Sequence, residues 1–372
     1  MTRQRAKRLL MPFAFLSTCA IALLAVFWPG SRGAHGAARA ERRGLSVRWR
    51  VQMPARPNAP CRCSVGLIVS DSAGSVTALS AEGRQVWETS FSNCAFEAGA
   101  VVTEGLAVVA SRQGQVFALR ADTGQTVWTQ TTDGEFQRAP VTGVIGKETV
   151  MWLVSQPDGK LFCLRARDGL VMWQGAPTNR CDGEVAAWQG RLAYGNCDGA
   201  IYVFNAVNGR LEGSVMVGSE DQMAGGLLST DAGILFAGTR QGNLAVVDIK
   251  TMTRKALVNV SQGEAFVTPV VAFGNQIAMG TPEGNVVFCS FADQCLKVSG
   301  RVAVGAPVDQ LLFEGGALYA LAGGAVFAWD SPNGRATRLA LGDDVRGLTA
   351  GRDELLFCVS DQAIACLKGS FK

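Results

Sequence analysis

Residues Gly114–Trp128, GQVFALRADTGQTVW, read as a strand, a tight turn and a second strand. The same phrase returns with small changes as GSVTALSAEGRQVW at Gly74–Trp87 and as GKLFCLRARDGLVMW at Gly159–Trp173. In each copy, apolar strand residues flank a short turn that contains glycine, which is typical of a β-hairpin. A hairpin that recurs along the chain predicts a repeat architecture, and the spacing of the copies decides which one.

The repeat runs through the chain eight times. The glycine that opens the hairpin marks each unit: Gly74, Gly114, Gly159, Gly199, Gly242, Gly284 and Gly324, with Gln362 in the eighth unit. Successive markers are 40, 45, 40, 43, 42, 40 and 38 residues apart, and Val, Leu or Ile stands two positions after each. Each unit holds about four short strands separated by turns, and that content at a period near 40 predicts a β-propeller blade.

The two ends of the chain are expected to close the ring. The eighth unit stops at Lys372 after its third strand, whereas an additional strand, SVRWRVQ at Ser46–Gln52, precedes the first unit. Trp49 stands in this strand where other fourth strands carry tryptophan. Because the strand can complete the last blade and leave no open sheet edge, we expect an all-β fold. Residues 45–372 are expected to form one eight-bladed β-propeller domain with four-stranded blades.

Residues 1–44 read as an export signal or an N-terminal membrane anchor, plus a linker. Basic MTRQRAKR precedes twenty largely apolar residues, Leu9–Trp28, which suit either a cleaved signal or a retained span. Four basic residues before this segment and one soon after it predict a cytoplasmic N-terminus. The propeller is then exported to the periplasmic side of the cell envelope, with the membrane contacted through the N-terminal segment. Cys19 invites a lipoprotein interpretation, but Thr18 and the continuing apolar run disfavour acylation.

Composition suits a folded, strand-rich domain. Hydrophobic residues make up 48% of the chain, charged residues 18%, and there are 44 glycines. The formal charge of +4 arises in the leader, because residues 1–43 hold eight basic residues and one glutamate, a net of +7, which leaves about −3 for residues 44–372. A mildly acidic body without a basic stripe argues against nucleic-acid binding.

The segment ADTGQTVW, Ala121–Trp128, resembles the tryptophan-docking repeat of PQQ-like, quinoprotein-type β-propellers. The tryptophan recurs at Trp49, Trp87, Trp128 and Trp173. In later units the resemblance fades, with Gly213 and Arg338 at the tryptophan position. Length, eight units and a simple leader are most similar to the BamB family of outer-membrane protein assembly factors. The resemblance implies that the tryptophans stack on the neighbouring blade as scaffold packing, not as a binding cage.

The sequence offers little for catalysis. Its only histidine, His35, lies in the leader, so the propeller has no Ser-His-Asp or Cys-His arrangement and no imidazole metal ligand. Two DGE triplets suit ordinary turns better than an acid pair. Quinone-dependent dehydrogenases of the resembled class carry an adjacent cysteine pair beside the cofactor, whereas this chain has no Cys-Cys dipeptide. We therefore expect no catalytic residue, cofactor or metal, and a quinone-dependent dehydrogenase is the least favoured function.

Ten cysteines remain beyond Cys19, an even number in a chain expected to be exported, so disulfides are open. Cys163 and Cys366 fill a repeat position that is alanine in other units, which predicts buried free thiols. Cys181 and Cys197 belong to connections that emerge on the same face of blade four, so this pair could bridge. Further candidate pairs are Cys61 or Cys63 with Cys94, Cys289 with Cys295, and Cys358 with Cys366.

The loops that join the fourth strand of one blade to the first strand of the next are expected to bind a protein partner. Loops vary while blades keep the shape of the ring. The candidate residues are Asp133, Glu135, Arg138, Arg180, Asp182, Glu184, Glu220, Asp221, Glu264, Asp343, Asp344 and Arg346. Carboxylates around one funnel would attract a basic or hydrogen-bonding segment, although surface loops are commonly polar without a partner.

The resemblance also implies which loops matter most. BamB-like proteins contact their barrel partner through the loops after the third and fourth repeats, here PTNRCDGEV and GSEDQMAGG. Arg180 matches the family's loop arginine, and Glu220 with Asp221 roughly matches its acidic pair. A Pro-Thr-Asn run replaces the leucines expected before the arginine, so the partner contact would be weaker or different. We expect a non-catalytic envelope scaffold for outer-membrane protein assembly, with a ligand-sensing funnel as the alternative.

Overall fold

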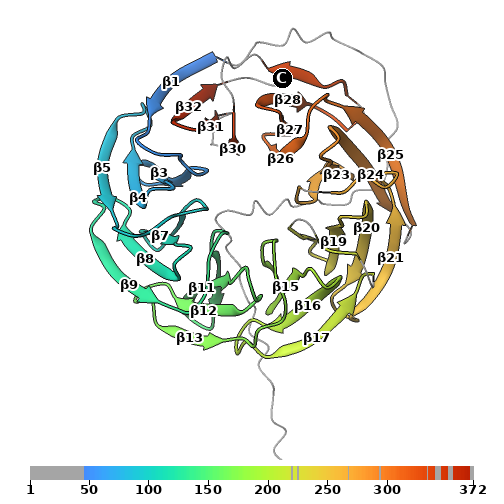
Figure 1. The fold of residues 1–372 in the computed structure, drawn as a ribbon, viewed down its shortest axis with the longest axis horizontal. Helices are drawn as coiled ribbons and strands as arrows, with labels where there is room; N and C mark the ends of the chain where they lie inside the picture. The colour runs from blue at the N-terminus through green and yellow to red at the C-terminus, as the bar shows by residue number, and fades with distance from the viewer. Residues whose placement is uncertain are drawn as a thin grey trace, which may run out of the picture.

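The computed structural model describes residues 46–368 apart from 219–220, 224–225, 267, 293–294, 333, 340–344 and 351–354. The expected leader therefore lies outside the described residues. Within them the regular elements are β-strands, arranged as eight four-stranded antiparallel sheets around a ring (Figure 1). In this part of the chain no helix is long and apolar enough to cross a membrane.

Each sheet is one blade, with its first strand innermost. Blades 1 and 2 comprise β2 (Cys61–Cys63), β3 (Gly66–Ser70), β4 (Ser75–Leu79), β5 (Gln85–Ser90), β6 (Val101–Thr103), β7 (Leu106–Ala110), β8 (Gln115–Arg120) and β9 (Thr126–Thr131). Blades 3 and 4 comprise β10 (Val141–Ile145), β11 (Glu148–Val154), β12 (Leu161–Arg165), β13 (Val171–Gln174), β14 (Ala186–Trp188), β15 (Arg191–Gly195), β16 (Ala200–Asn205) and β17 (Leu211–Met216). Blades 5 and 6 comprise β18 (Leu228–Ser229), β19 (Ile234–Gly238), β20 (Asn243–Asp248), β21 (Thr253–Asn259), β22 (Val271–Phe273), β23 (Gln276–Gly280), β24 (Asn285–Ala292) and β25 (Cys295–Ala303). Blades 7 and 8 comprise β26 (Val308–Glu314), β27 (Ala317–Ala322), β28 (Ala325–Trp329), β29 (Thr337–Leu339), β30 (Gly347–Ala350), β31 (Leu355–Val359), β32 (Ala363–Lys368) and β1 (Ser46–Gln52).

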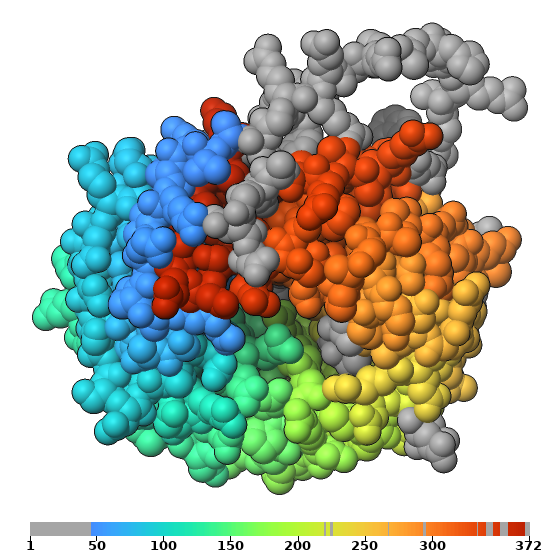
Figure 2. Space-filling view, turned by 45° about the horizontal axis from the view of Figure 1, so that its top comes forward, coloured from blue at the N-terminus to red at the C-terminus, as the bar shows by residue number. Residues whose placement is uncertain are grey.

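The ring closes with strands from both ends of the chain. β1 pairs antiparallel with β32, with Ser46 opposite Lys368 and Gln52 opposite Ala363, so the order in blade 8 is β1-β32-β31-β30. Figure 2 shows the blue N-terminal strand lying against the red C-terminal blade. The predicted eight-bladed propeller and its closure by the N-terminal strand are confirmed.

The marker glycines of the repeat are required by backbone geometry. All seven have a positive φ, from +66° at Gly159 to +89° at Gly74, a region that glycine enters without the steric cost of a side chain. Six of them, all but Gly324, are shown to lie against the connection that follows their hairpin. A Cβ added to Gly114 would lie 2.5 Å from the carbonyl oxygen of Gly134, so each hairpin turn has room for a close backbone contact.

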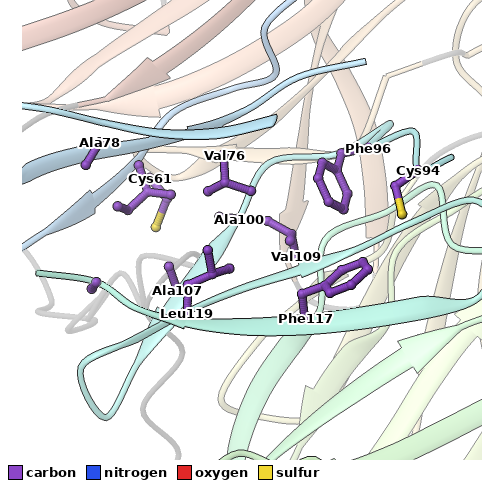
Figure 3. Packing of buried hydrophobic residues seen from close by; sticks show 12 residues of the cluster. Cys61, Val76, Ala78, Cys94, Phe96, Ala100, Ala107, Val109, Phe117 and Leu119 are labelled. Carbon is purple, nitrogen blue, oxygen red and sulfur yellow. The ribbon is translucent and has the colours of Figure 1, made fainter. Parts of the chain in front are cut away.

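Apolar side chains fill the junctions between neighbouring blades. Because side chains alternate across a strand, each blade contributes one set to the preceding junction and the other set to the following junction. Figure 3 shows the junction of blades 1 and 2, where Val76 and Ala78 of β4 share a core with Val109 and Phe117 of the next blade. Their strand neighbour Leu79 lies instead in the junction of blades 8 and 1.

Tryptophans on the outer strands dock one blade on the next. Trp128 of β9 packs on a turn of blade 3, where a Cβ added to Gly169 would lie 2.5 Å from the indole ring. Its Nε1 donates to the carbonyl oxygen of Ala166 at 2.9 Å. Trp49 and Trp87 make the same pair of contacts with turns of blades 1 and 2. These tryptophans pack the scaffold, as the resemblance implied.

At the junction of blades 4 and 5, the position that carries tryptophan elsewhere is a glycine, and the position that carries glycine elsewhere is a methionine. Gly213 of β17 stands at the tryptophan position, and Met252, with φ +53°, stands at the glycine position. A Cβ added to Gly213 would lie 3.7 Å from Cε of Met252, so the methionine occupies space that an indole fills elsewhere. Trp188 of β14 adds a second contact, since its ring packs on Gly233 and its Nε1 donates to Asp231 O at 3.1 Å.

Strand alternation also separates cysteines that are close in sequence. Cys358 lies in the junction of blades 7 and 8, and Cys366 in the junction of blades 8 and 1, so these two cannot bridge across their hairpin. Cys289 is buried whereas Cys295 is exposed. Figure 3 shows Cys61 and Cys94 at opposite ends of one core. The pairings of Cys61 with Cys94, Cys289 with Cys295 and Cys358 with Cys366 are therefore not formed in this structure, and Cys63 is a free thiol as well. Cys163 and Cys366 are buried free thiols as predicted.

Candidate partner-binding face

The inter-blade loops, which join the fourth strand of one blade to the first strand of the next, lie at one end of the ring. The turns between second and third strands emerge at the same end, because neighbouring antiparallel strands alternate in direction; we name this end the loop face. One backbone contact between the two kinds of segment recurs from blade to blade. The N–H groups donate from Arg112 to Ala95, from Gln156 to Glu135, from Cys197 to Arg180 and from Arg240 to Gln222. These bonds fix four of the inter-blade loops against the blade that each loop enters.

Asp182, in the loop entering blade 4, is the centre of a cluster on this face. Nε and a terminal nitrogen of Arg138 donate to its carbonyl oxygen at 3.2 and 2.7 Å. Its carboxylate accepts from Arg180 Nε at 2.8 Å, from Gln156 Nε2 at 3.0 Å and from a terminal nitrogen of Arg240 at 3.4 Å. We call these five residues the Asp182 cluster. They come from blades 3, 4 and 5, so the cluster ties three blades together.

The cluster presents its cations and covers its anion. The Asp182 side chain is 12% exposed, whereas those of Arg180 and Arg240 are 60% and 50% exposed. Arg138 is exposed as well. Arg180 and Arg240 bond the carboxylate of Asp182, and Arg138 bonds its carbonyl oxygen, so three exposed guanidinium groups gather around one covered carboxylate.

Burial disfavours the charged form of Asp182, but its partners outweigh that effect. The hydrogen bond and charge of Arg180, the hydrogen bond from Gln156 and the charge of Arg240 hold the pKa of this carboxyl below its ordinary value. Opposite charges within hydrogen-bond distance lower a carboxyl pKa in this way. Asp182 is therefore ionised at neutral pH, and its contacts hold the inter-blade loops entering blades 3 and 4 against turns of blades 3 and 5.

We expect an Asp182→Asn variant to lose part of the acid dependence of stability. Since the folded-state pKa is below the unfolded value of about 3.9, the carboxylate stabilises the fold above that value and stops doing so as pH falls through the folded pKa. The difference in free energy of unfolding between wild type and variant should be constant from about pH 5 to 7 and shrink below about pH 4.

Urea unfolding across this pH range measures that difference. Asp122→Asn is the matched control, since Asp122 pairs with Arg120 at an exposed site, where ion pairs contribute little. An Asp182→Asn difference that stays unchanged down to pH 3 would contradict the assignment of an ionised Asp182.

Most other predicted carboxylates of the loop face contact neighbouring side chains. The contacts are Asp133 to Lys160 at 2.6 Å, Glu135 to Arg112 at 4.0 Å, Asp221 to Asn243 at 2.6 Å and Glu264 to Arg301 at 2.9 Å. Glu184 is exposed, and Arg346 pairs with Asp361 at 3.5 Å. Glu220, Asp343 and Asp344 lie outside the described residues. These carboxylates thus tether loops to blades, and their part in partner binding stays a prediction.

The structure brings Arg138, Arg180 and Asp182 together as neighbours, and adds two residues that were not among the sequence candidates. Gln156 and Arg240 belong to the turns between second and third strands, whereas the candidates from sequence lie in the inter-blade loops. A usable signal exists in the repeat. Both residues directly follow a buried polar residue of the turn, Ser155 or Thr239, at the position whose N–H reaches the loop.

Cys181 and Cys197, the pair that could bridge, are free thiols in this structure, like the other cysteines of the described residues, and their pairing stays a prediction. Cys181 points into the core between blades 3 and 4, and burial raises its pKa to about 12. Cys197 Sγ instead lies 3.7 Å from Asp182 Oδ2. Within the described residues, no three His, Cys, Asp or Glu side chains are grouped to hold a metal ion.

Comparison with known proteins agrees with this architecture. The family model described as outer membrane protein assembly factor BamB matches residues 72–294 and 142–338. The crystal structure of BamB from Moraxella catarrhalis has a TM-score of 0.72 at 17% identity, covering 88% of this chain and 98% of that one. No curated protein matches the sequence.

Two other solved propellers show how widely this fold is used. Sqt1 from Saccharomyces cerevisiae has a TM-score of 0.70 at 12% identity, covering 88% of this chain and 98% of that one. The quinohemoprotein alcohol dehydrogenase ADHIIG from Pseudomonas putida HK5 has a TM-score of 0.62 at 13% identity, covering 88% and 77%. At such identities these likenesses show the fold alone. The matched segments of the family model span more than half of the chain, and the protein therefore belongs to the BamB family of PQQ-like propellers.

Proposed function

We propose that the protein is a non-catalytic interaction scaffold of the cell envelope that assists outer-membrane protein assembly. The observation that carries this proposal is the Asp182 cluster, which presents exposed arginines from three consecutive blades on one face. Membership of the BamB family supports the setting. The protein partner docks on the loop face over blades 3 to 5.

The arrangement suits recognition for two physical reasons. Arginine is enriched among the residues that dominate binding energy, because its planar group donates several directed hydrogen bonds. The arginines are also held in place before binding, since Arg138 and Arg180 are bonded to Asp182 at 2.7 and 2.8 Å. A preorganised surface loses less conformational entropy when a partner binds.

A photo-crosslinking residue in place of Glu184 tests this function in cells. Glu184 is exposed beside the cluster, whereas Asp182 itself is covered and is needed for the contacts around it. The matched control is Lys147, exposed in the turn between β10 and β11 at the opposite end of blade 3. We expect the probe at position 184 to capture an outer-membrane barrel or a subunit of its assembly machinery, and the probe at position 147 not to do so.

The captured species is identified by mass spectrometry, with the protein shown to be folded by protease resistance. Capture of no protein from position 184 would contradict the scaffold proposal and favour the alternative, a propeller that senses a small molecule in its funnel. Equal capture from both positions would contradict the assignment to the loop face.

A further inference from the structure

We infer that the ring lies with one edge on the lipid surface from which its N-terminal segment emerges, and that exposed apolar side chains at the base of its outer strands make this contact. The inference goes beyond the proposed function, and it rests on the expectation that Leu9–Trp28 inserts in a membrane. The surface concerned lies at the end of the ring opposite the loop face.

Exposed apolar side chains gather on five consecutive blades, at or just before the start of each fourth strand. These starts lie opposite the loop face, because neighbouring antiparallel strands alternate in direction. The residues are Val47 in blade 8, Val86 in blade 1, Val127 in blade 2, Leu170 in blade 3, and Val207 and Leu211 in blade 4, each 42% to 56% exposed. We name these six residues the apolar rim. Figure 1 shows the strands concerned, β1, β5, β9, β13 and β17, following one another along the outside of the ring.

The packing of the ring does not require these side chains to be apolar. In β5 and β9 the next residue is the docking tryptophan, Trp87 or Trp128. Because side chains alternate along a strand, Val86 and Val127 point away from the junction that the tryptophan fills. Blades 5 and 7 lack the feature, since β21 and β29 both begin with Thr-Arg instead. A row of exposed apolar residues on neighbouring blades, unlike a single one, indicates a contact surface.

The direction of β1 identifies what the apolar rim faces. Ser46, the first residue of β1, lies opposite Lys368, at the end of the third strand of blade 8. The chain therefore enters the ring at the end that carries the rim, next to Val47. Residues 29–45 separate this point from the apolar segment Leu9–Trp28. Even fully extended, a linker of this length spans at most about 60 Å, so the rim stays close to any bilayer that holds the segment.

A tethered surface needs little affinity of its own. A short flexible linker gives the attached domain an effective concentration of roughly millimolar at its target. Apolar side chains that enter the interfacial region of a bilayer then bind in proportion to the apolar area they bury. The lipid surface is thus the occupant that the tether presents to the rim, and the loop face at the other end of the ring stays open to a protein partner.

Net charge does not select this surface. Charged residues beside the rim occur in pairs of opposite sign: Arg84 with Glu82 at 3.9 Å, Arg120 with Asp122 at 3.3 Å, and Arg167 with Glu148 at 3.3 Å. We therefore expect the rim to contact zwitterionic and anionic lipids alike, with little change in about 0.5 M salt, which screens exposed charges.

Fluorescence quenching by brominated lipid tests the contact in the full-length chain. A fluorescent amino acid incorporated by codon suppression at position 170 reports on the rim, and the same residue at position 184 reports on the loop face. Each protein is reconstituted into phosphatidylcholine vesicles with or without bromine on the acyl chains near the headgroup. We expect brominated lipid to quench the probe at position 170 by about twofold or more, as for a side chain in the interfacial region, and to leave the probe at position 184 unquenched.

Substitutions in the neighbouring blade separate contact through the rim from simple proximity to the bilayer. A Val207→Ser/Leu211→Ser variant leaves position 170 unchanged and should reduce the quenching there by about half, because the buried apolar area falls. The matched control is Met216→Ser, which alters a residue that is 54% exposed at the loop-face end of the same strand and should have no effect. Cooperative melting curves show that the variants are folded.

Three results would overturn the inference. The first is equal quenching at positions 170 and 184, absent quenching at both, or quenching at position 170 that ignores the double serine substitution. The second is the loss of residues 9–28 from protein isolated from membranes, since the tether would be gone. The third is a probe at position 170 whose emission shifts in detergent as protein concentration rises, which would assign the rim to a second copy of the chain. Partner capture from position 184 is a separate measurement, so the scaffold function stands or falls independently.

Discussion

Replacing Trp128 by alanine should lower the free energy of unfolding by about 3 kcal/mol. The indole packs on Gly169 in the next blade and donates from Nε1 to Ala166 O at 2.9 Å. Truncation removes that packing, leaves a space beside a rigid turn and leaves the carbonyl without its donor, and none of these losses can be repaired by local collapse. Guanidinium unfolding followed by circular dichroism measures the change.

Val127→Ala is the matched control, because Val127 is the adjacent strand residue and is 47% exposed. Its substitution should change the free energy of unfolding by no more than about 0.5 kcal/mol. Equal effects at Trp128 and Val127 would mean that the docking contact does not hold the blades together.

Gly213→Trp should be strongly destabilising alone and tolerated together with Met252→Gly. A tryptophan at position 213 must share its space with Met252, since a Cβ there already lies 3.7 Å from the methionine Cε. Overpacking of this kind costs about 1–3 kcal/mol. Met252→Gly removes the obstacle and suits the φ of +53° at that turn position, which glycine adopts without strain. The double variant recreates the kind of docking pair that Trp128 forms with Gly169.

A double-mutant cycle of unfolding free energies tests this exchange. We expect the double variant to be more stable than the sum of the single effects by about 2 kcal/mol, as for residues in direct contact. As a control, Gly213→Trp combined with Val127→Ala, in blade 2, should be additive. Additivity in the Gly213–Met252 pair would contradict the proposed exchange of large and small residues.

The loop face shows where sequence interpretation stops. Arg138 is 44 positions away from Asp182 along the chain, about one repeat, whereas the 58 positions between Asp182 and Arg240 match no interval of the repeat. Their meeting depends on the side-chain conformations of loops from three blades. The sequence identifies the acidic residues of these loops and predicts that they attract a partner. In the structure, most of them pair with cations and amides of the blades.

For the cysteines, the sequence predicted burial correctly but predicted pairing poorly. Their positions in the repeat correctly predicted that Cys163 and Cys366 are buried. Proximity in a hairpin was a poor guide to pairing, because Cys358 and Cys366 point into different junctions. The register of the hairpin places Phe357, not Cys358, opposite Cys366, and side chains alternate between the two faces of a strand, so the two thiols lie on opposite faces of the blade.

The amino-acid sequence by itself determined the ring. Recurring glycines at positive φ, alternating apolar residues and docking tryptophans are local requirements of every blade, so their period identifies the architecture. The unpaired Trp49 strand likewise identified how the ring closes. Only the tertiary structure decided the charge of the loop face, because the net field there depends on which side chains from separate blades neutralise one another. Local sequence patterns therefore determine the ring, whereas contacts between loops that are distant in sequence determine the charge of the loop face.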